Sequence, residues 1–363
     1  MHTSSPFIAA FIRLGQFLRQ FPESTGPYSG TEDPDLEKLN KEYFQGFSEI
    51  LEHEPVLNPW FTRESLMKAL KGIASMLEVE VLEEWLNPYG IKPIATEAQL
   101  SVALVLAGNI PMVGFHDVMS VLASGHKVLA KPSSKDDRLI RKVAEVLSGI
   151  DPEIGSRIQF TDDKLSGMDA VIATGSNNSA RYFEYYFRKI PHIIRKNRNG
   201  VAVLSGLESE DELAALGEDI FTYFGMGCRN VTKLYIPESY DLKILLGVLD
   251  SFHPLYQHHK YGNNVDYYRT IYLMNQVPIL DNGVLLLKED TALASPVGVV
   301  FYERYSDLGF VQQELELHRQ EIQCIVSGNP EIDGAILPGT TQIPMPWDYA
   351  DGVDTIRFLM ELA

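Results

Sequence analysis

Residues 102–111 read VALVLAGNIP, and this stretch decides the fold. Six apolar residues in succession are typical of a strand buried on both faces, and the glycine, asparagine and proline after them end it. Two later stretches, KVLAKPSS at 127–134 and AVIATGS at 170–176, have the same form. A helical pattern follows each stretch, most clearly behind a capping-box pattern at Ser134 and Asp137, with apolar residues at Leu139, Val143, Leu147 and Ile150. Strand, turn and helix in this order predict a doubly wound parallel sheet, which binds ligands beyond the carboxyl ends of its strands.

A cysteine lies in a second informative stretch, FGMGCR at residues 224–229. The segment before it predicts a helix, because a capping-box pattern at Ser209 and Glu212 precedes apolar residues at helical spacing: Leu213, Leu216, Ile220, Phe221 and Phe224. The segment after it, VTKLYI at 231–236, predicts a strand that stops at Pro237. Glycines on both sides of the turn allow a sharp bend and the close approach of a substrate carbonyl to the sulfur. Cys228 is therefore a candidate nucleophile, and the alternative is a small buried hydrophobic residue.

The chain of 363 residues has room for two domains, and its formal net charge of −18 disfavours nucleic acid and anionic membranes as partners. One basic stretch, 181–198, holds six cationic residues and a single acidic one. We interpret it as a solvated helix face, with a contact to the phosphates of coenzyme A as the alternative. Cys228 and Cys324 are the only cysteines, which gives neither a disulfide framework nor a zinc pattern and fits a reducing cytoplasm.

The N-terminal part of the chain shows no targeting pattern. Residues 6–21 are amphipathic and interrupted by arginines, unlike a secretory signal, and the longest apolar stretch, 102–115, is too short to span a bilayer. Apolar residues at helical spacing predict helices that cover the sheet: Leu66, Leu70, Ile73, Leu77 and Val81. Residues 22–37, rich in proline, glycine, serine and acidic side chains, predict an exposed connection. We expect a cytoplasmic enzyme without an integral membrane segment.

In their order and spacing these motifs resemble the aldehyde dehydrogenase superfamily, and within it the fatty-acyl-CoA reductases related to the reductase subunit of bacterial luminescence operons. The likeness covers about residues 95–300. It rests on GNIP at 108–111, GHKVLAKPS at 125–133, TGS at 174–176, Cys228, and SPVG at 295–298. The resemblance implies an α/β fold of the aldehyde dehydrogenase type. We expect N-terminal helices and a Rossmann-type dinucleotide-binding domain over 1–200, an α/β catalytic domain over 201–340, and a segment at 341–363 that returns to the first domain or serves oligomerisation.

The implied reaction is the NAD(P)H-dependent reduction of a fatty acyl thioester, such as acyl-CoA, to an aldehyde. Cys228 would attack the acyl carbonyl, expel coenzyme A or another thiol carrier, and form an enzyme-bound thioester. Asn109 is the candidate oxyanion donor, together with the backbone N–H of Cys228. The alternative for Asn109 is a purely structural place in the turn before Ile110 and Pro111. Arg229 either favours the thiolate or serves as a surface or phosphate contact.

The expected cofactor residues are Lys131, Ser133, Ser134, Gly175 and Ser176. Gly175 permits close backbone approach, Ser176 can donate to a pyrophosphate at the following helix N-terminus, and Lys131 contacts the adenosine ribose. NAD-preferring relatives commonly have a glutamate at the position of Ser134, whose carboxylate repels a 2′-phosphate. Ser134 followed by Lys135 removes that repulsion, so NADPH is the expected cofactor and NADH the alternative. Ser134 is also expected to cap the next helix.

Two departures from the family pattern bear on the chemistry. Hydrolytic members have a glutamate that activates water against the acyl-enzyme, and Asn197 stands nearest that position, in RKNRNGV at 195–201. An amide is a poor general base, so the departure favours acyl-CoA reduction over aldehyde oxidation to an acid. The second departure is Ala292, where the family usually has a glutamate that holds the nicotinamide ribose; Glu289 and Asp290 are the candidates to replace it.

An aromatic and histidine-rich stretch, FHPLYQHHKYGNN at 252–264, is a candidate wall of an acyl tunnel. A metal site at His253, His258 and His259 is disfavoured, because no matching ligand spacing follows. Besides the acyl thioester, a second copy of the chain or an acyl-donor protein are the partners considered. Two other functions stay open: a hydrolytic aldehyde dehydrogenase whose base comes from elsewhere, and a non-catalytic partner subunit of a reductase complex.

Overall fold

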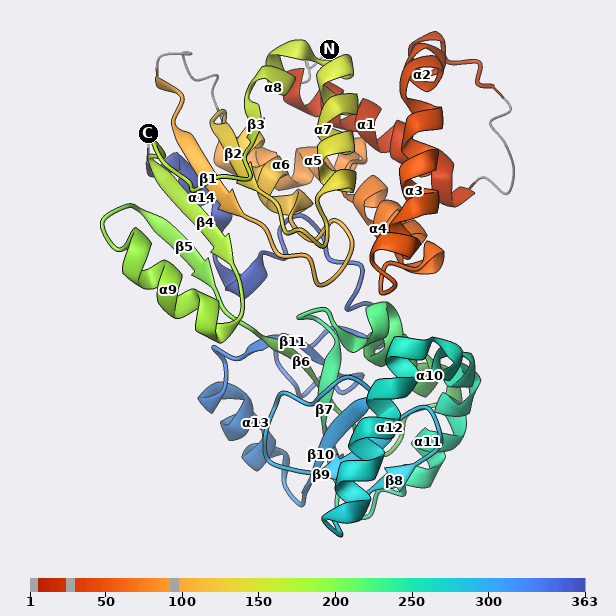
Figure 1. Cartoon of the computed structure of the whole chain (residues 1–363). Coiled ribbons are helices and arrows are strands. Elements are labelled where there is room, and N and C mark those ends of the chain that lie inside the picture. Colours follow the sequence, from red (N-terminus) through yellow and green to blue (C-terminus); the bar gives the residue numbers. More distant parts are fainter. Residues whose placement is uncertain (1–5, 24–29, 92–97, 363) are drawn as a thin grey trace. The chain divides into compact units, whose positions relative to one another are not determined.

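The computed structural model describes residues 6–23, 30–91 and 98–362 of the chain. They form two compact units (Figure 1). The first contains the chain up to Lys196 together with the part from Met345 onward, and the second is Asn197–Pro344. The chain therefore leaves the first unit once and returns to it once.

The first unit is built on a sheet of five parallel strands in the order β3-β2-β1-β4-β5. The strands are β1 (Ser101–Val105), β2 (Lys127–Lys131), β3 (Ile158–Phe160), β4 (Ala170–Thr174) and β5 (His192–Arg195). Val105 at the end of β1 lies beside Lys131 of β2 and Ala173 of β4. The winding reverses between β1 and β4, which confirms the doubly wound parallel sheet predicted from the three strand-and-turn stretches.

Helices surround this sheet. They are α1 (Pro6–Glu23), α2 (Pro34–Leu39), η1 (Asn40–Phe44), α3 (Gln45–Leu57), α4 (Arg63–Met76), α5 (Val79–Leu86), η2 (Asn87–Tyr89), α6 (Phe115–Ala123), α7 (Arg138–Ile150), α8 (Pro152–Ser156), α9 (Asn177–Phe187), η6 (Ala350–Gly352) and α14 (Thr355–Met360). One hydrophobic core joins Phe11 of α1 and Leu70 of α4 to Val102 of β1. Of the expected connection at 22–37, residues 24–29 lie outside the described residues, and α1 and α2 occupy its two ends.

The C-terminal segment is part of the first unit. The Tyr349 hydroxyl accepts a hydrogen bond from Trp85 Nε1 at 2.7 Å. Arg195, at the end of β5, is buried. Its Nη1 donates to both carboxylate oxygens of Asp117 in α6, each at 2.6 Å, and its Nη2 donates to Thr355 Oγ1 in α14 at 3.1 Å. The interpretation of the basic stretch as a solvated face is therefore wrong for Arg195, which holds α14 against α6.

The second unit has a six-stranded sheet in the order β11-β6-β7-β10-β9-β8, in which only β8 is antiparallel to its neighbour. Its strands are β6 (Asn199–Val203), β7 (Val231–Pro237), β8 (Leu280–Asp281), β9 (Leu286–Glu289), β10 (Val299–Tyr305) and β11 (Ile322–Val326). Its helices are α10 (Glu210–Phe221), η4 (Thr222–Gly225), α11 (Leu242–Leu249), η5 (Asp250–Gln257), α12 (His259–Met274) and α13 (Leu308–Leu317). The predicted strand after Cys228 is β7, and it ends at Pro237 as expected.

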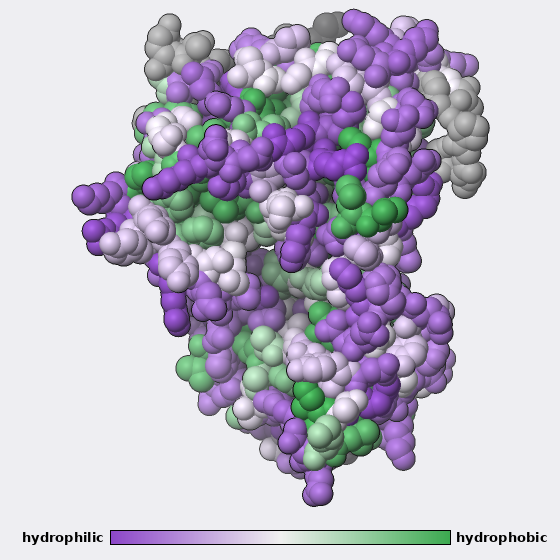
Figure 2. All heavy atoms as spheres, in the orientation of Figure 1, coloured by the Kyte–Doolittle hydropathy of each residue, from purple (hydrophilic) through white to green (hydrophobic). Residues whose placement is uncertain are grey.

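The predicted capping box at the start of α10 is confirmed. The Ser209 N–H donates to the Glu212 carboxylate at 2.8 Å, and the Glu212 N–H donates to Ser209 Oγ at 3.3 Å. Across 6–23, 30–91 and 98–362, no helix is both long enough and apolar enough to cross a bilayer. Figure 2 shows hydrophilic residues over much of the visible face, with hydrophobic residues in small groups.

Candidate active site

The carboxyl edge of the first sheet brings together the predicted cofactor residues and the turn of Asn109. Lys131 ends β2, Gly175 follows β4, and Asn109 follows β1, the strand between them. Parallel neighbours end at the same edge, so the three turns are adjacent (Figure 1). This is the edge at which doubly wound sheets bind nucleotides.

The Asn109 turn is packed on its inner side. Gly108 is buried against the β2 loop, where a Cβ atom at this position would lie 2.6 Å from Ser133 Oγ. A Cβ atom on Gly114 would likewise lie 2.8 Å from the Leu106 side chain. The Asn109 side chain, in contrast, is exposed. The turn thus combines a buried base with an outward-facing amide.

The loop after β2 differs from the prediction at its far end. Lys131 Nζ donates to the carbonyl oxygens of Asp162 and Asp163, at 3.2 and 2.8 Å. Ser134 and Lys135 lie in an exposed turn, and α7 begins only at Arg138. The capping role expected for Ser134 is therefore wrong. The turn closes instead through a bond from the Asp136 N–H to the Ser133 carbonyl at 2.9 Å.

The turn after β4 leads directly into α9. Ser176 is the N-cap of this helix, and its Oγ accepts from the Ser179 N–H at 3.2 Å. A Cβ at Gly175 would lie 2.9 Å from Ser179 Cβ and 3.0 Å from the Phe183 ring, so the glycine lets the helix pack against its own turn. The positive end of the helix dipole is thereby directed to the sheet edge that carries the other cofactor candidates.

In the second unit, Cys228 is half-buried in the turn between η4 and β7. Asn230, which is fully buried, holds this turn. Its Oδ1 accepts from the Gly227 N–H at 2.7 Å, and its Nδ2 donates to the carbonyls of Asp219 and Thr222, both at 2.9 Å. Asn230 was not among the predicted site residues, and its one signal in the sequence is a polar residue between the glycine-containing turn and β7.

The backbone just before Cys228 is strained. The apolar spacing predicted a helix through Phe224, but α10 ends at Phe221, and Tyr223 and Phe224 adopt left-handed conformations with φ of 53° and 59°. Each such residue costs on the order of 1 kcal/mol. Burial of both side chains compensates, and the Phe224 ring lies 4.4 Å from the His258 ring and 5.8 Å from that of Tyr261.

Arg229 also fastens the turn. Its Nε donates to the Thr341 carbonyl at 2.7 Å. The Thr341 N–H and hydroxyl donate in turn to the buried Asp219 carboxylate, at 3.0 and 2.8 Å. The structure therefore gives Arg229 a structural contact that neither of its two expected roles included.

The strands of the second sheet bring two other residues toward the Cys228 turn. Gly200 of β6 lies opposite Val231 of β7, and a Cβ on Gly200 would approach the Arg229 carbonyl oxygen to 2.6 Å. Cys324 of β11 pairs with Gly200, and its sulfur is 3.5 Å from the same carbonyl oxygen. Asn197 lies two residues before β6 and Cys228 three residues before β7, so both precede neighbouring parallel strands at one edge.

The two candidates to replace the missing glutamate at Ala292 differ in their surroundings. Asp290 accepts hydrogen bonds from Lys288 and from the Ala292 N–H, the latter at 3.0 Å, and its carbonyl accepts from the buried Lys233. Burial opposes ionisation, but the Lys288 ammonium holds the pKa of Asp290 below its ordinary value. Glu289, at the end of β9, is exposed.

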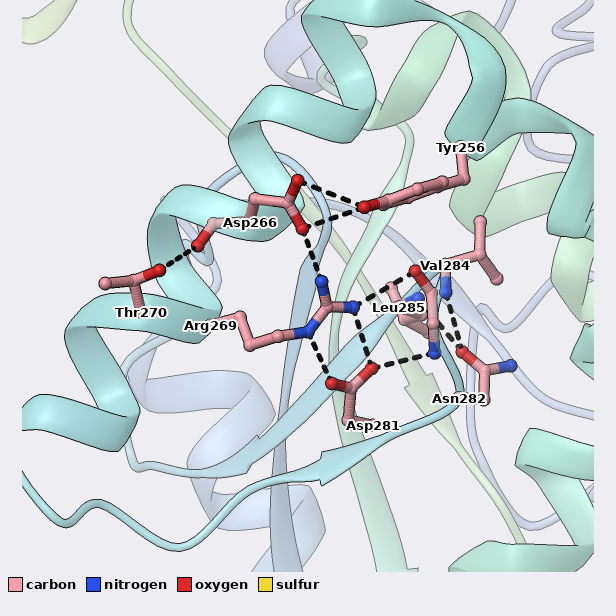
Figure 3. A network of polar contacts seen from close by, with 9 residues as sticks. Tyr256, Asp266, Arg269, Thr270, Asp281, Asn282, Val284 and Leu285 are labelled. Atoms are coloured by element: carbon pink, nitrogen blue, oxygen red, sulfur yellow. Dashed lines mark hydrogen bonds and ion pairs between the residues drawn. The ribbon is translucent and has the colours of Figure 1, made fainter.

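The stretch 252–264 forms η5 and the start of α12. Tyr256 donates to the Asp266 carboxylate at 2.9 Å, and Arg269 bonds both Asp266, at 2.5 Å, and Asp281, at 2.6 Å (Figure 3). His258 is the N-cap of α12, and its Nδ1 accepts from the Tyr261 N–H at 3.3 Å. Within the part of the chain that the structure describes, no group of three or more histidine, cysteine, aspartate or glutamate residues could hold a metal ion.

Solved structures share this architecture. The indole-3-acetaldehyde dehydrogenase of P. syringae, solved with NAD+, superposes with a TM-score of 0.61 at 13% identity, over 90% of this chain and 73% of its own. Aldehyde dehydrogenase 21 from Physcomitrella patens gives 0.60 at 13% identity, over 97% and 84%. The NADP-dependent glyceraldehyde-3-phosphate dehydrogenase of Bacillus halodurans, solved with NADP, gives 0.59 at 14% identity, over 88% and 72%.

At such low identities these superpositions show the fold alone, which is the α/β fold of the aldehyde dehydrogenases with a Rossmann-type unit and a second α/β unit. No protein-family model matches the chain, and no curated protein matches it in sequence. The function therefore has to be argued from the residues.

Proposed function

We propose that the protein is an NAD(P)H-dependent reductase that converts an acyl thioester, with acyl-CoA as the substrate, to an aldehyde through an acyl-enzyme on Cys228. The observation that carries the proposal is that Asn197 lies two residues before β6 and Cys228 three residues before β7, which are neighbouring parallel strands. An amide rather than a carboxylate at Asn197 supplies no general base for the attack of water on the acyl-enzyme. Such an intermediate persists long enough to be reduced.

The chain's own residues account for acyl transfer. The Cys228 thiolate attacks the thioester carbonyl, the tetrahedral oxyanion collapses, and the coenzyme A thiolate leaves. The turn fixed by Asn230 and Arg229 sets the direction of the Cys228 backbone, so that its N–H serves as one oxyanion donor. The Asn109 amide is assigned as the second donor. Reduction of the acyl-enzyme gives a thiohemiacetal on Cys228, whose collapse releases the aldehyde and restores the thiolate.

The nucleotide is proposed to bind at the carboxyl edge of the first sheet, where it supplies the hydride. The residues fit such a ligand: Ser176 opens a helix whose dipole favours a pyrophosphate, and Lys131 adds a positive charge two strands away, at the end of β2. Ser134 and Lys135 are exposed and carry no negative charge that would repel a 2′-phosphate. NADPH is therefore the proposed cofactor.

The test is NADPH oxidation assayed with acyl-CoA of increasing chain length, with aldehyde and free coenzyme A measured in the same samples. The proposal predicts one aldehyde and one coenzyme A for each NADPH consumed. NADH at the same concentration serves as the matched comparison and should support slower turnover. Oxidation of an aldehyde to free acid without coenzyme A would instead identify a hydrolytic enzyme. No turnover at any chain length would favour a non-catalytic partner subunit.

A further inference from the structure

A buried carboxyl group joins two loops of the first unit at the proposed nucleotide edge. Asp136, 5% exposed, lies between β2 and α7. Its Oδ2 accepts a hydrogen bond from the Met112 N–H at 2.7 Å, and its own N–H donates to the Ser133 carbonyl at 2.9 Å. One residue therefore connects the turn of Asn109 with the loop of Ser133 and Ser134.

The fit between the two loops is tight. A Cβ atom on Gly108 would lie 2.6 Å from Ser133 Oγ and 3.3 Å from Asp136 Cβ. Met112 is buried and has a φ of 59°, a conformation that costs on the order of 1 kcal/mol in a residue with a side chain. The bond from its N–H to Asp136 helps to hold it there. The shape of the Asn109 turn thus depends on where the Ser133 loop lies.

A carboxyl group at this buried position destabilises the folded state when it is ionised. Its second oxygen, Oδ1, is buried and has no hydrogen-bond partner among the residues that the structure describes. Burial raises the pKa of Asp136 to about 7; the Met112 N–H opposes this effect, whereas Glu54 of α3 and the neighbouring Asp137 add to it. An asparagine would accept the same bond from Met112 without burying an ionisable group.

We propose that Asp136 is a positioning residue for the reaction, which holds the Asn109 turn in register with the Ser133–Ser134 loop and so links nucleotide binding to the placement of the oxyanion donor. The inference rests on the proposed function for its effect on turnover. A nucleotide that orders Ser133 and Ser134 would, through Asp136, order Met112 and the exposed Asn109 three residues before it. Asp136 itself is not assigned a contact with the substrate.

The test compares hydrogen exchange and kinetics in three proteins. In the wild type, NADPH should slow exchange of the amides in 108–114 by about tenfold. In Asp136→Ala that protection should disappear, and kcat should fall by about 10–100-fold with little change in the KM for NADPH, the scale expected when a catalytic group is misplaced. Asp136→Asn retains the acceptor for Met112 and should retain both the protection and most of the activity.

Asp169→Ala is the matched control, since the Asp169 carboxylate accepts from the Ser101 N–H at 2.8 Å at the opposite end of β1. It should leave the exchange of 108–114 and kcat unchanged. An equal loss in this control, or unchanged exchange and kcat in Asp136→Ala, would overturn the proposal. If Asp136→Ala does not fold, Gly108→Ala disturbs the same contact and must show the same loss.

The exchange measurement also separates this inference from the proposed reaction. Suppose that the wild type shows no acyl-CoA reduction, but that NADPH protects 108–114 in the wild type and in Asp136→Asn and not in Asp136→Ala. The proposed function then fails, whereas the link between nucleotide binding and the Asn109 turn stands. If reduction is observed without that dependence, the proposed function stands and the linkage fails.

Discussion

Asn230 shows how much the turn that carries Cys228 depends on one buried amide side chain. Three of its hydrogen bonds join the Gly227 N–H to the carbonyls of Asp219 and Thr222 in the interior of the second unit. These bonds hold a turn that follows two left-handed residues. The glycines around Cys228 permit the turn, and Asn230 fixes its shape.

We therefore expect Asn230→Ala to lower the free energy of unfolding by about 2–4 kcal/mol, because it leaves several buried polar groups unpaired. Alkylation of Cys228 should slow in the variant at a denaturant concentration where it is still folded. Asn264→Ala is the control, since Asn264 makes a single bond to Lys260 within α12 and should cost less than about 1 kcal/mol. Equal unfolding midpoints for the two variants would contradict the role of Asn230.

Asn109 carries the second prediction at this scale. Asn109 is exposed on a turn with a buried base, so Asn109→Ala should change the free energy of unfolding by less than about 1 kcal/mol. It should lower kcat for acyl-CoA reduction by roughly 10²–10³-fold, the scale of one lost oxyanion donor, with the KM for NADPH nearly unchanged. Steady-state kinetics would measure both constants, and near-normal turnover would restrict Asn109 to a structural place in the turn.

Among the elements, those with a complete local signal could be predicted from the sequence. The strands β1, β2 and β4 contain apolar runs followed by glycine or proline, β7 alternates and stops at Pro237, and the capping box of α10 is specified within four residues. The end of α10 could not be predicted, because the apolar spacing continues to Phe224. What ends the helix is packing of Phe224 against His258 and Tyr261, more than 30 positions along the chain.

The prediction of a helix cap in the loop after β2 was wrong for a related reason. Ser134 and Asp137 satisfy the capping pattern, yet the loop is held by contacts from other elements: Asn58 Nδ2, at the end of α3, donates to the Lys135 carbonyl at 3.3 Å, and Asp136 faces Met112. Asp137 instead bonds Arg141 at 2.5 Å. These contacts with other elements together stabilise the loop more than a side-chain helix cap would, since such a cap is worth about 1 kcal/mol.

This loop also makes the stability of the protein depend on pH. Asp136 binds a proton up to pH about 7 in the folded chain, against an ordinary value of 3.8, so between these values the folded state holds more protons than the unfolded state. Its contribution is therefore favourable below that window and is lost as the pH rises through 7. Asp136→Asn removes the dependence. In urea unfolding, the free energy of unfolding of the variant minus that of the wild type should increase by about 2 kcal/mol from about pH 5 to about pH 8.5. A difference that does not vary with pH would contradict the burial argument.

At the scale of the whole molecule, the order of the motifs was enough to predict the fold. Each turn motif is unspecific by itself, but its position relative to the predicted strands makes it informative. Side-chain contacts between residues far apart in the sequence could not be predicted in this way. Arg195 was grouped with a solvated basic stretch, whereas its partners Asp117 and Thr355 lie 78 and 160 positions away. Burying that guanidinium requires both of them, and neither is marked in the sequence as a partner.

At this scale the proposed acyl-enzyme leads to a prediction about its products. Asn197→Glu would place a carboxylate just before β6, the strand beside the one that Cys228 precedes, and should provide a base for water. The free acid released from acyl-CoA should then rise at the expense of the aldehyde, as measured by the ratio of the two products with and without NADPH. Asn197→Gln, without a base, should keep the wild-type ratio. An unchanged ratio in a folded, acylated glutamate variant would remove the main support for an acylating reductase.

The most direct measurement is the mass of the protein after incubation with acyl-CoA, followed by addition of NADPH. In the absence of NADPH, one acyl group should appear on the peptide that contains Cys228, in the wild type and in Cys324→Ala, but not in Cys228→Ala. On addition of NADPH, the label should disappear and an equal amount of aldehyde should form. A label on Cys324, no label on either cysteine, or release of free acid in place of aldehyde would contradict the proposed function.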